Sequence, residues 1–181
     1  MRIELENAAI EIVVGDITEQ RDMDAIVNAA NAELMSGGGV AGAIHRKAGP
    51  ELAQACRPLA PIRPGEAVIT GSFRLPNTHV IHCLGPIYGV DKPEAELLAR
   101  CYASAIALAD TRGIGSLAFP ALSTGAFSYP VEEAAPVACA AVAEALVRAE
   151  SMRVVRHVLT NEALVQIFAA ETSKAVGRRA R

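Results

Sequence analysis

Residues 24–46 read DAIVNAANAELMSGGGVAGAIHR, and this stretch decides how the rest of the chain is interpreted. Its apolar start, Ala25–Val27, predicts a buried strand, and the glycines of Gly37–Gly39 precede an amphipathic helical pattern. A glycine loop that leads into a helix presents free backbone N–H groups and the positive end of the helix dipole to an anion. Just upstream, Asn28 and Asn31 can donate to and accept from sugar hydroxyls. The stretch therefore predicts a site for a ribose linked to phosphate.

The composition favours an α/β fold built as one domain. Apolar residues make up 51% of the 181 residues but aromatic residues only 4%, so the core consists mainly of Ala, Val, Leu and Ile. Strand patterns alternate with helical patterns, which predicts a three-layer α/β/α sandwich with ligand-binding loops after the strand ends. We expect the domain to span residues 1–172 and a basic tail to span 173–181. The strands are expected at 2–5, 10–14, 24–28, 66–71, 78–84, 115–119 and 153–159, and the helices at 38–57, 93–112, 131–149 and 161–171.

Charge and cysteine usage exclude several classes of partner. A net charge of −3 argues against broad binding to nucleic acid or to an anionic membrane. The four cysteines are widely spaced and form no C-x-x-C pair, which is typical of buried free thiols in a reducing compartment. The first residues mix charged and apolar side chains, unlike a signal peptide. We therefore expect a cytoplasmic domain with no membrane partner and no sequence-specific nucleic-acid partner.

Two further loops carry candidate binding residues. Asp16 and Ile17 directly follow the strand expected at 10–14, where a carboxylate can accept from an exocyclic amine such as that of adenine. An aspartate in a loop is also a common turn or helix-capping residue, so both interpretations of Asp16 stay open. The loop 119–130 contains Ser123, Thr124, Gly125 and Ala126, whose successive N–H groups predict a second anion site.

Other functional motifs fit the chain less well. Gly37, Gly39 and Gly42 satisfy the dinucleotide pattern G-x-G-x-x-G, but they lie about eight residues beyond the strand and no suitably spaced acidic residue follows. The chain has no G-K-S or G-K-T motif, which argues against a P-loop. His79 and His82 are three apart in an apparent strand, so they face opposite sides and cannot share a metal. No residue pattern requires a metal or a cofactor.

Taken together, these motifs resemble those of macrodomains, and most closely those of the MacroD-type ADP-ribosyl hydrolases. The resemblance extends from about Ile10 to Phe168 and rests on ordered motifs that are specific in combination. They are Gly-Asp-Ile at 15–17, Val-Asn-Ala-Ala-Asn at 27–31, Gly-Gly-Gly-Val-x-Gly-Ala-Ile-His-Arg at 37–46, and Ser-Thr-Gly at 123–125 followed by Tyr129-Pro130. The resemblance implies a macrodomain sandwich with a mixed central sheet.

The resemblance also implies a role for each matching residue. Asp16 would accept the adenine amino group beside the backbone of Ile17, and Asn31 would bind the distal ribose. Two loops would enclose the distal ribose and the diphosphate, with Phe127 as the aromatic residue against that ribose. The first consists of Gly37, Gly38, Gly39 and Val40, and the second of Ser123, Thr124, Gly125, Ala126 and Phe127.

Three positions depart from the family pattern. Ala41 stands where MacroD-type enzymes usually carry the aspartate that is the proposed general base or water-orienting group, and alanine can do neither. Thr160 lies near the place of an aromatic residue against the adenine in many members, a loss worth ~1 kcal/mol. Pro136, inside the helix expected at 131–149, should kink or shorten its first turns.

Two functional hypotheses from different classes follow from the resemblance. The first is hydrolysis of an ester at the distal ribose, either on a protein mono-ADP-ribosylated at Asp or Glu or in O-acetyl-ADP-ribose, with a water held by a phosphate oxygen. The second, favoured by Ala41, is a non-catalytic module that binds ADP-ribose. A nucleotide-dependent oxidoreductase is a third possibility, and the glycine spacing disfavours it.

Overall fold

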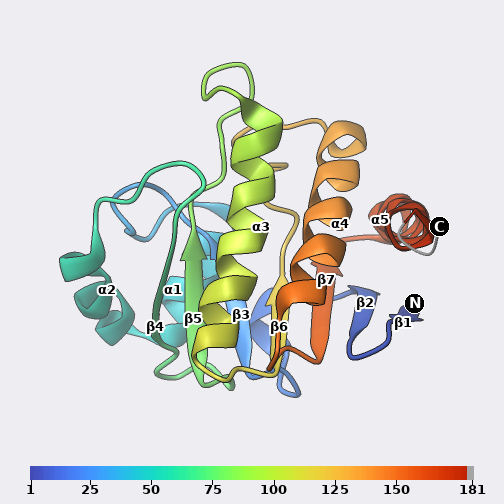
Figure 1. Ribbon diagram of the computed structural model, residues 1–181. Helices are drawn as coiled ribbons and strands as arrows, with labels where there is room; N and C mark the ends of the chain where they lie inside the picture. The colour runs from blue at the N-terminus through green and yellow to red at the C-terminus, as the bar shows by residue number, and fades with distance from the viewer. Residues whose placement is uncertain (179–181) are drawn as a thin grey trace.

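A computed structural model describes residues 1–178 of the chain, and its centre is one seven-stranded mixed sheet (Figure 1). The strand order is β1-β2-β7-β6-β3-β5-β4, in which the five strands from β2 to β5 run parallel and the two edge strands run antiparallel to their neighbours. The strands are β1 (Arg2–Glu4), β2 (Ala9–Val14), β3 (Ala25–Ala29), β4 (Ala67–Gly71), β5 (His79–Cys83), β6 (Ser116–Phe119) and β7 (Val154–Leu159). The predicted α/β class and mixed sheet are confirmed.

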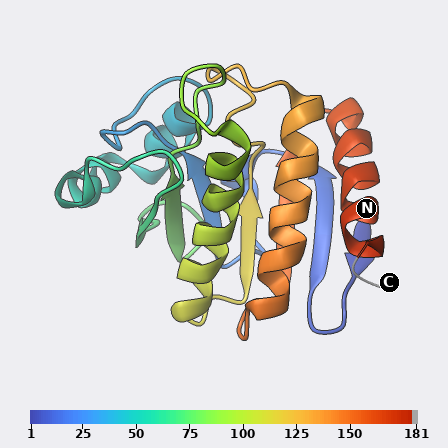
Figure 2. The same cartoon turned by 45° about the horizontal axis from the view of Figure 1, so that its top comes forward.

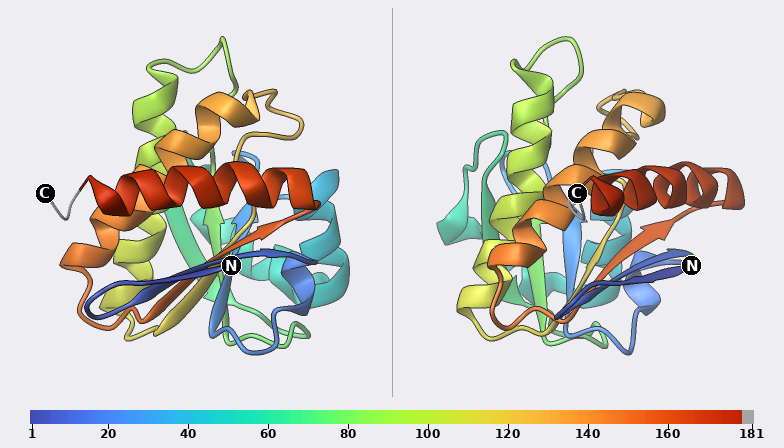
Figure 3. Two further views of the ribbon diagram at one scale, coloured as in Figure 1. Left: turned by 90° about the vertical axis from the view of Figure 1, so that its right-hand side faces the viewer. Right: turned by 45° about the vertical axis from the view of Figure 1, so that its right-hand side comes forward.

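Helices cover both faces of this sheet and complete the three layers. One face carries the three long helices α3 (Glu94–Thr111), α4 (Val131–Arg148) and α5 (Glu162–Gly177), which lie side by side in Figure 2. Figure 3 shows α5 crossing the edge of the sheet next to β1 and β2. The opposite face carries α1 (Gly39–Ala48) and α2 (Pro50–Cys56), with two 3-10 turns, η1 (Ile17–Glu19) and η2 (Arg57–Leu59). No helix in residues 1–178 is long and apolar enough to cross a membrane.

The alternation of side chains along the strands separates two apolar cores. In β3, Ala25 and Val27 belong to the core beneath α3, α4 and α5, while Ile26 belongs to the core beneath α1 and α2. Successive strand residues point to opposite faces, so this division follows directly from the sequence order. All four cysteines are buried free thiols.

The helices differ from the predicted ones in three places. The single helix predicted at 38–57 is wrong, because Gly49 adopts a φ of 89° and Pro50 has no N–H to continue α1. Of the two effects predicted at Pro136, a kink or a shortening, the shortening is wrong, since α4 runs across it from Val131 to Arg148. Pro136 has no N–H to donate to the carbonyl of the exposed Glu132. The helix α5 continues to Gly177 rather than ending at 171, so residues 173–177 are helical, and residues 179–181 of the predicted tail lie outside the described part.

The parallel strands place several loops at one edge of the sheet. The carboxyl ends of β2, β7, β6, β3 and β5 all lie at the same edge, toward the top of Figure 1. The Gly15–Ile17 segment follows β2, the glycine loop follows β3 and the 120–130 loop follows β6. Parallel pairing therefore brings together three loops that are far apart in the sequence.

Two histidines are buried in the two cores, one on each side of the sheet. His157 is fully buried against Tyr102, Phe119 and Phe168, and neither ring nitrogen has a hydrogen-bond partner within the described residues. Burial lowers the pKa of His157 to about 4. Burial, with a smaller contribution from the nearby His45, lowers the pKa of His82 to about 3.

The free energy of unfolding should therefore fall on acidification. Below about pH 6.5 the unfolded chain protonates these histidines while the folded chain excludes the proton, so stability is lost as the pH falls toward the folded pKa values. We expect a loss on the order of 2 kcal/mol from each histidine between about pH 7 and pH 5, measured by urea denaturation. The His157→Leu variant should lose about half as much. An unchanged pH dependence in this variant would contradict the assignment.

Candidate functional site

A cleft opens at the carboxyl edge of the sheet, with a volume of about 790 Å³. This volume lies in the range of small-molecule sites, roughly 300–1,000 Å³. The cleft is bounded by the loops that follow β2, β3, β6 and β7. Its lining includes ten predicted binding residues, Asp16, Ile17, Gly38, Gly39, Val40, Ser123, Thr124, Gly125, Ala126 and Phe127.

Asp16 caps a turn with one carboxylate oxygen and leaves the other oxygen free. One of its carboxylate oxygens accepts from the backbone N–H and the hydroxyl of Thr18, each at 2.8 Å, and so caps η1. These bonds lower the pKa of Asp16, which keeps it ionised at neutral pH. No partner is recorded for the second oxygen within residues 1–178, and Asp16 lines the cleft. The capping bonds thus orient a free acceptor at this end of the cleft.

The glycine loop supplies the first set of free backbone donors. Helix α1 begins at Gly39, and the N–H groups of Gly39, Val40 and Ala41 have no acceptor in the described part of the chain. The first N–H groups of a helix lack intrahelical partners, and the helix dipole adds positive potential there. Gly38 and Gly39 have open space where a Cβ would lie, so a ligand can approach their backbone closely.

The loop after β6 supplies the second set. Ser123 adopts a left-handed φ of 65°, and the turn is closed by bonds from the Ser128 N–H to the Gly125 carbonyl and from the Tyr129 N–H to the Ser123 carbonyl. Within residues 1–178 the N–H groups of Gly125, Ala126 and Phe127 have no acceptor. Successive N–H groups left free in one turn form an anion-binding concavity.

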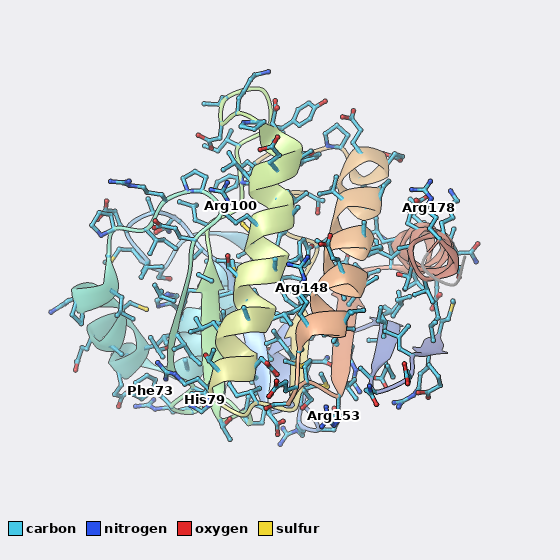
Figure 4. The ribbon with its side chains drawn as sticks, viewed as in Figure 1. Phe73, His79, Arg100, Arg148, Arg153 and Arg178 are labelled. Atoms are coloured by element: carbon cyan, nitrogen blue, oxygen red, sulfur yellow. The ribbon has the colours of Figure 1, made fainter. Side chains whose placement is uncertain are left out.

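The two loops enclose a cleft that lacks cationic side chains. Asp16 is the only ionisable residue that lines the cleft among the described residues. The arginines labelled in Figure 4 lie elsewhere, with Arg100 on α3, Arg148 at the end of α4, Arg153 before β7 and Arg178 after α5. An anion in this cleft would therefore be bound by neutral donors, chiefly the free backbone N–H groups, rather than by a cationic side chain.

Asn31 lies in the loop beside the cleft rather than in its lining. Its Oδ1 accepts from the Met35 N–H at 3.0 Å and its Nδ2 donates to the Met35 carbonyl at 2.9 Å. The Oδ1 can accept one more hydrogen bond and the Nδ2 can donate one more. Asn31 is therefore held in one orientation with hydrogen-bonding capacity left for a ligand. A Cβ on Gly37 would lie 3.5 Å from the Asn31 Nδ2, which places Gly37 next to this amide but outside the lining.

The prediction that Asn28 contacts a sugar is wrong. Asn28 is fully buried in β3 on the face covered by α1 and α2, and its Nδ2 lies 3.1 Å from the Nδ1 of His82. The other ring nitrogen of His82 lies 2.9 Å from the Thr70 hydroxyl. The strand continues to Ala29, one residue beyond its predicted end, so Asn28 is an interior strand residue and Ala29 is the residue that reaches the cleft.

Ala41 is buried in the first turn of α1 and does not line the cleft either. Thr160 does line it, next to apolar residues that sequence reasoning had not assigned to the site. These are Ala29, Ala43, Pro120, Ala121, Val131, Val158, Leu159 and Leu164. The ends of β3 and β7, the loop after β6 and the N-terminal turns of α1, α4 and α5 bring them there. Their apolar character alone did not distinguish them from core residues.

Comparison with known proteins agrees with this architecture. The model of the Macro domain family matches residues 27–138, which is more than half of the chain. The chain therefore belongs to the macrodomain family. A macro domain-containing protein of Chlorobaculum tepidum is 51% identical over 142 residues, which cover 78% of this chain and 82% of that protein. A protein of Citrobacter rodentium named O-acetyl-ADP-ribose deacetylase is 45% identical and covers 90% of this chain and 94% of its own length.

Solved structures of macrodomains share the whole fold. The macrodomain of Oceanobacillus iheyensis with ADP has a TM-score of 0.92 at 37% identity and covers 98% of this chain and 97% of its own. The Trypanosoma brucei macrodomain in complex with ADP-ribose has a TM-score of 0.82 at 32% identity and covers 89% of this chain and 68% of its own. The neighbouring macrodomains thus bind ADP or ADP-ribose.

The position of the glycine loop depends on Gly42. A Cβ at Gly42 would collide with the Gly37 carbonyl oxygen, so the Gly42→Ala substitution should displace the loop although alanine favours helix by about 1 kcal/mol. We expect a lower melting temperature for Gly42→Ala. The matched change Gly177→Ala at the end of α5, where no atom lies within 4 Å, should be neutral or stabilising. Equal melting temperatures for the two variants would show that the loop does not depend on this contact.

Proposed function

We propose that this macrodomain binds ADP-ribose and hydrolyses an ester at its distal ribose. The observation that carries the proposal is the pair of free N–H sets on two loops that line one cleft without lysine or arginine. A diphosphate offers oxygens to both sets at once, and the nucleoside and the second ribose then extend to either side. The deacetylase name of the Citrobacter rodentium relative and the ligands of the neighbouring structures support the same ligand class.

In the proposed complex each region of the cleft contacts one part of the ligand. The free oxygen of Asp16 accepts from the adenine amine, while Ile17 and Val158 pack near the base. The N–H groups of Gly39 and Val40 on one side, and of Gly125–Phe127 on the other, bind the diphosphate. Asn31 binds the distal ribose with the donor and acceptor capacity left over from its bonds to Met35.

The proposed reaction relies on positioning rather than on a strong base. Two loops that bend the diphosphate can place a phosphate oxygen where it holds a water near the distal ribose. The water oxygen adds to the carbon of the ester linkage as the bond from that carbon to the leaving oxygen breaks. One proton of the water stays on the new hydroxyl and the other is transferred to the leaving oxygen, which departs as the acid or the alcohol. Orientation and fixed dipoles can supply a large share of a rate enhancement. We propose that the substrates are O-acetyl-ADP-ribose and proteins mono-ADP-ribosylated at Asp or Glu.

A non-catalytic ADP-ribose-binding module is the second candidate function. Helix α1 carries no acidic residue in its first turn, and Ala41 stands where the resemblance to MacroD-type enzymes implies an aspartate. A cleft without a base can still bind the same ligand. We further propose a cytoplasmic location, which the four buried free thiols support.

The Gly125→Glu variant tests where the diphosphate binds. We expect the unmodified protein to bind ADP-ribose in the micromolar range, roughly −8 kcal/mol, and AMP far more weakly. Gly125 is exposed with no atom within 4 Å of an added Cβ, so Gly125→Glu should fold while its bulk and negative charge abolish binding. Calorimetry measures both affinities. The control Gly177→Glu carries the same charge on α5 and should bind normally. Unchanged affinity in a folded Gly125→Glu protein would exclude this loop.

The Ala41→Asp variant tests the enzymatic proposal. A carboxylate here would lie in the first turn of α1, where the helix dipole favours it, and could orient the water. General-base help is worth ~100-fold in kcat with little change in KM, measured as ADP-ribose released from a mono-ADP-ribosylated protein and from O-acetyl-ADP-ribose. Ala41→Asn has a similar shape without the charge and should gain nothing.

We expect weak hydrolysis by the unmodified protein and less by Asn31→Ala, since loss of this amide misplaces the distal ribose. If all these proteins bind ADP-ribose and none releases it from either substrate, the enzymatic proposal fails and the binding module remains.

A further inference from the structure

One end of the cleft is lined by Asp16 and Ile17, and we call it the base end because the adenine base is proposed to bind there. A chain of hydrogen bonds supports this end from the protein interior. The Gln20 Nε2 donates to the backbone carbonyl of Asp16 at 2.7 Å. Gln20 is buried and lies outside the lining of the cleft, so it contacts the loop from the protein side. This bond connects the interior directly to the peptide that joins Asp16 to Ile17.

The bond determines which way that peptide faces. In a trans peptide the carbonyl and the following N–H point in opposite directions. Since the Asp16 carbonyl points to Gln20, the Ile17 N–H points away from Gln20. In the described chain this N–H has no acceptor, and Ile17 lines the cleft. Gln20 therefore fixes a free donor beside the free carboxylate oxygen of Asp16.

Arg156 in turn determines the orientation of the Gln20 amide. Its Nη1 donates to the Gln20 Oε1 at 2.9 Å. An arginine can only donate, so the oxygen of Gln20 must face Arg156 and the NH₂ group must face Asp16. Arg156 is itself held by Glu11 at 2.6 Å and by two bonds to Asp22 at 2.6 and 2.8 Å, with only 13% of its side chain exposed.

The backbone of Gln20 is anchored as well. The buried Asn77 donates from its Nδ2 to the carbonyls of Gln20 and Met23, at 2.7 and 2.8 Å. Both ends of Gln20 are thus restrained before any ligand binds. The Asp16 carboxylate oxygen and the Ile17 N–H then form a restrained pair of one acceptor and one donor. Such a pair can reject a base whose own donor and acceptor are exchanged, because acceptor would face acceptor and donor would face donor.

We infer that Gln20 and Arg156 are positioning residues that make the base end of the cleft selective for a 6-aminopurine. Adenine offers an amine to the Asp16 carboxylate and a ring-nitrogen acceptor to the Ile17 N–H. Hypoxanthine presents an oxygen and an N–H at the same two places, so both contacts become repulsive. This inference rests on the proposed binding of ADP-ribose.

The test compares ADP-ribose with inosine 5′-diphosphoribose by calorimetry in four proteins. Gln20→Glu keeps the shape and an acceptor for Arg156 but places a carboxylate oxygen against the Asp16 carbonyl. Gln20→Met keeps the length and removes both bonds without adding charge. Gln54→Met is the matched control, since Gln54 is exposed on α2 and does not line the cleft.

The unmodified protein and Gln54→Met should bind ADP-ribose about tenfold more tightly than inosine 5′-diphosphoribose, or better. Both Gln20 variants should bind ADP-ribose more weakly, so that their affinities for the two ligands differ by no more than about threefold. A Gln20 that only stabilises the fold would weaken both ligands equally, and that result, or an unchanged preference, would overturn the inference. If the unmodified protein binds neither ligand, the proposed function fails and this inference fails with it.

Discussion

A diphosphate carries charge that a protein usually neutralises with lysine or arginine, and no lysine or arginine among residues 1–178 lines this cleft. Without cationic side chains the site depends on backbone donors, and this dependence explains how its loops and glycines are arranged. Backbone N–H groups carry only partial charges, so several must converge at short range to hold an anion. Convergence requires two loops at one place, and the parallel strands β3 and β6 deliver them to the same edge of the sheet.

Backbone recognition also explains where glycine is required. A Cβ on Gly85 would collide with the Ser123 Oγ, and a Cβ on Gly42 would collide with the Gly37 carbonyl. These two glycines lie behind the loops, whereas Gly38, Gly39 and Gly125 face open space. The first group allows the loops to pack closely against the scaffold, and the second allows a ligand to reach the backbone. The same residue type therefore serves two distinct purposes in one site.

Much of this site was predictable because its motifs are local in sequence. The strand-loop-helix pattern of residues 24–46 and the Ser-Thr-Gly loop at 123–125 predict both N–H sets. Asn28 was misplaced because the strand extends one residue further than its apolar pattern indicates, which turns this side chain into the core. The break at Gly49 was missed because both flanking segments continue the helical apolar pattern. Gln20 and Arg156 could not have been paired from sequence, since 136 positions separate them and only the sheet brings them together.

The most direct measurement of the central claim is an amide NMR titration with ADP-ribose. Amide protons that bind phosphate shift downfield, and each can be assigned to one residue. The largest downfield shifts are predicted for Gly39, Val40, Gly125, Ala126 and Phe127, with the amide of Gly177 on α5 unmoved. Binding that leaves these five amides unshifted while it perturbs lysine or arginine side chains elsewhere would contradict recognition by the backbone.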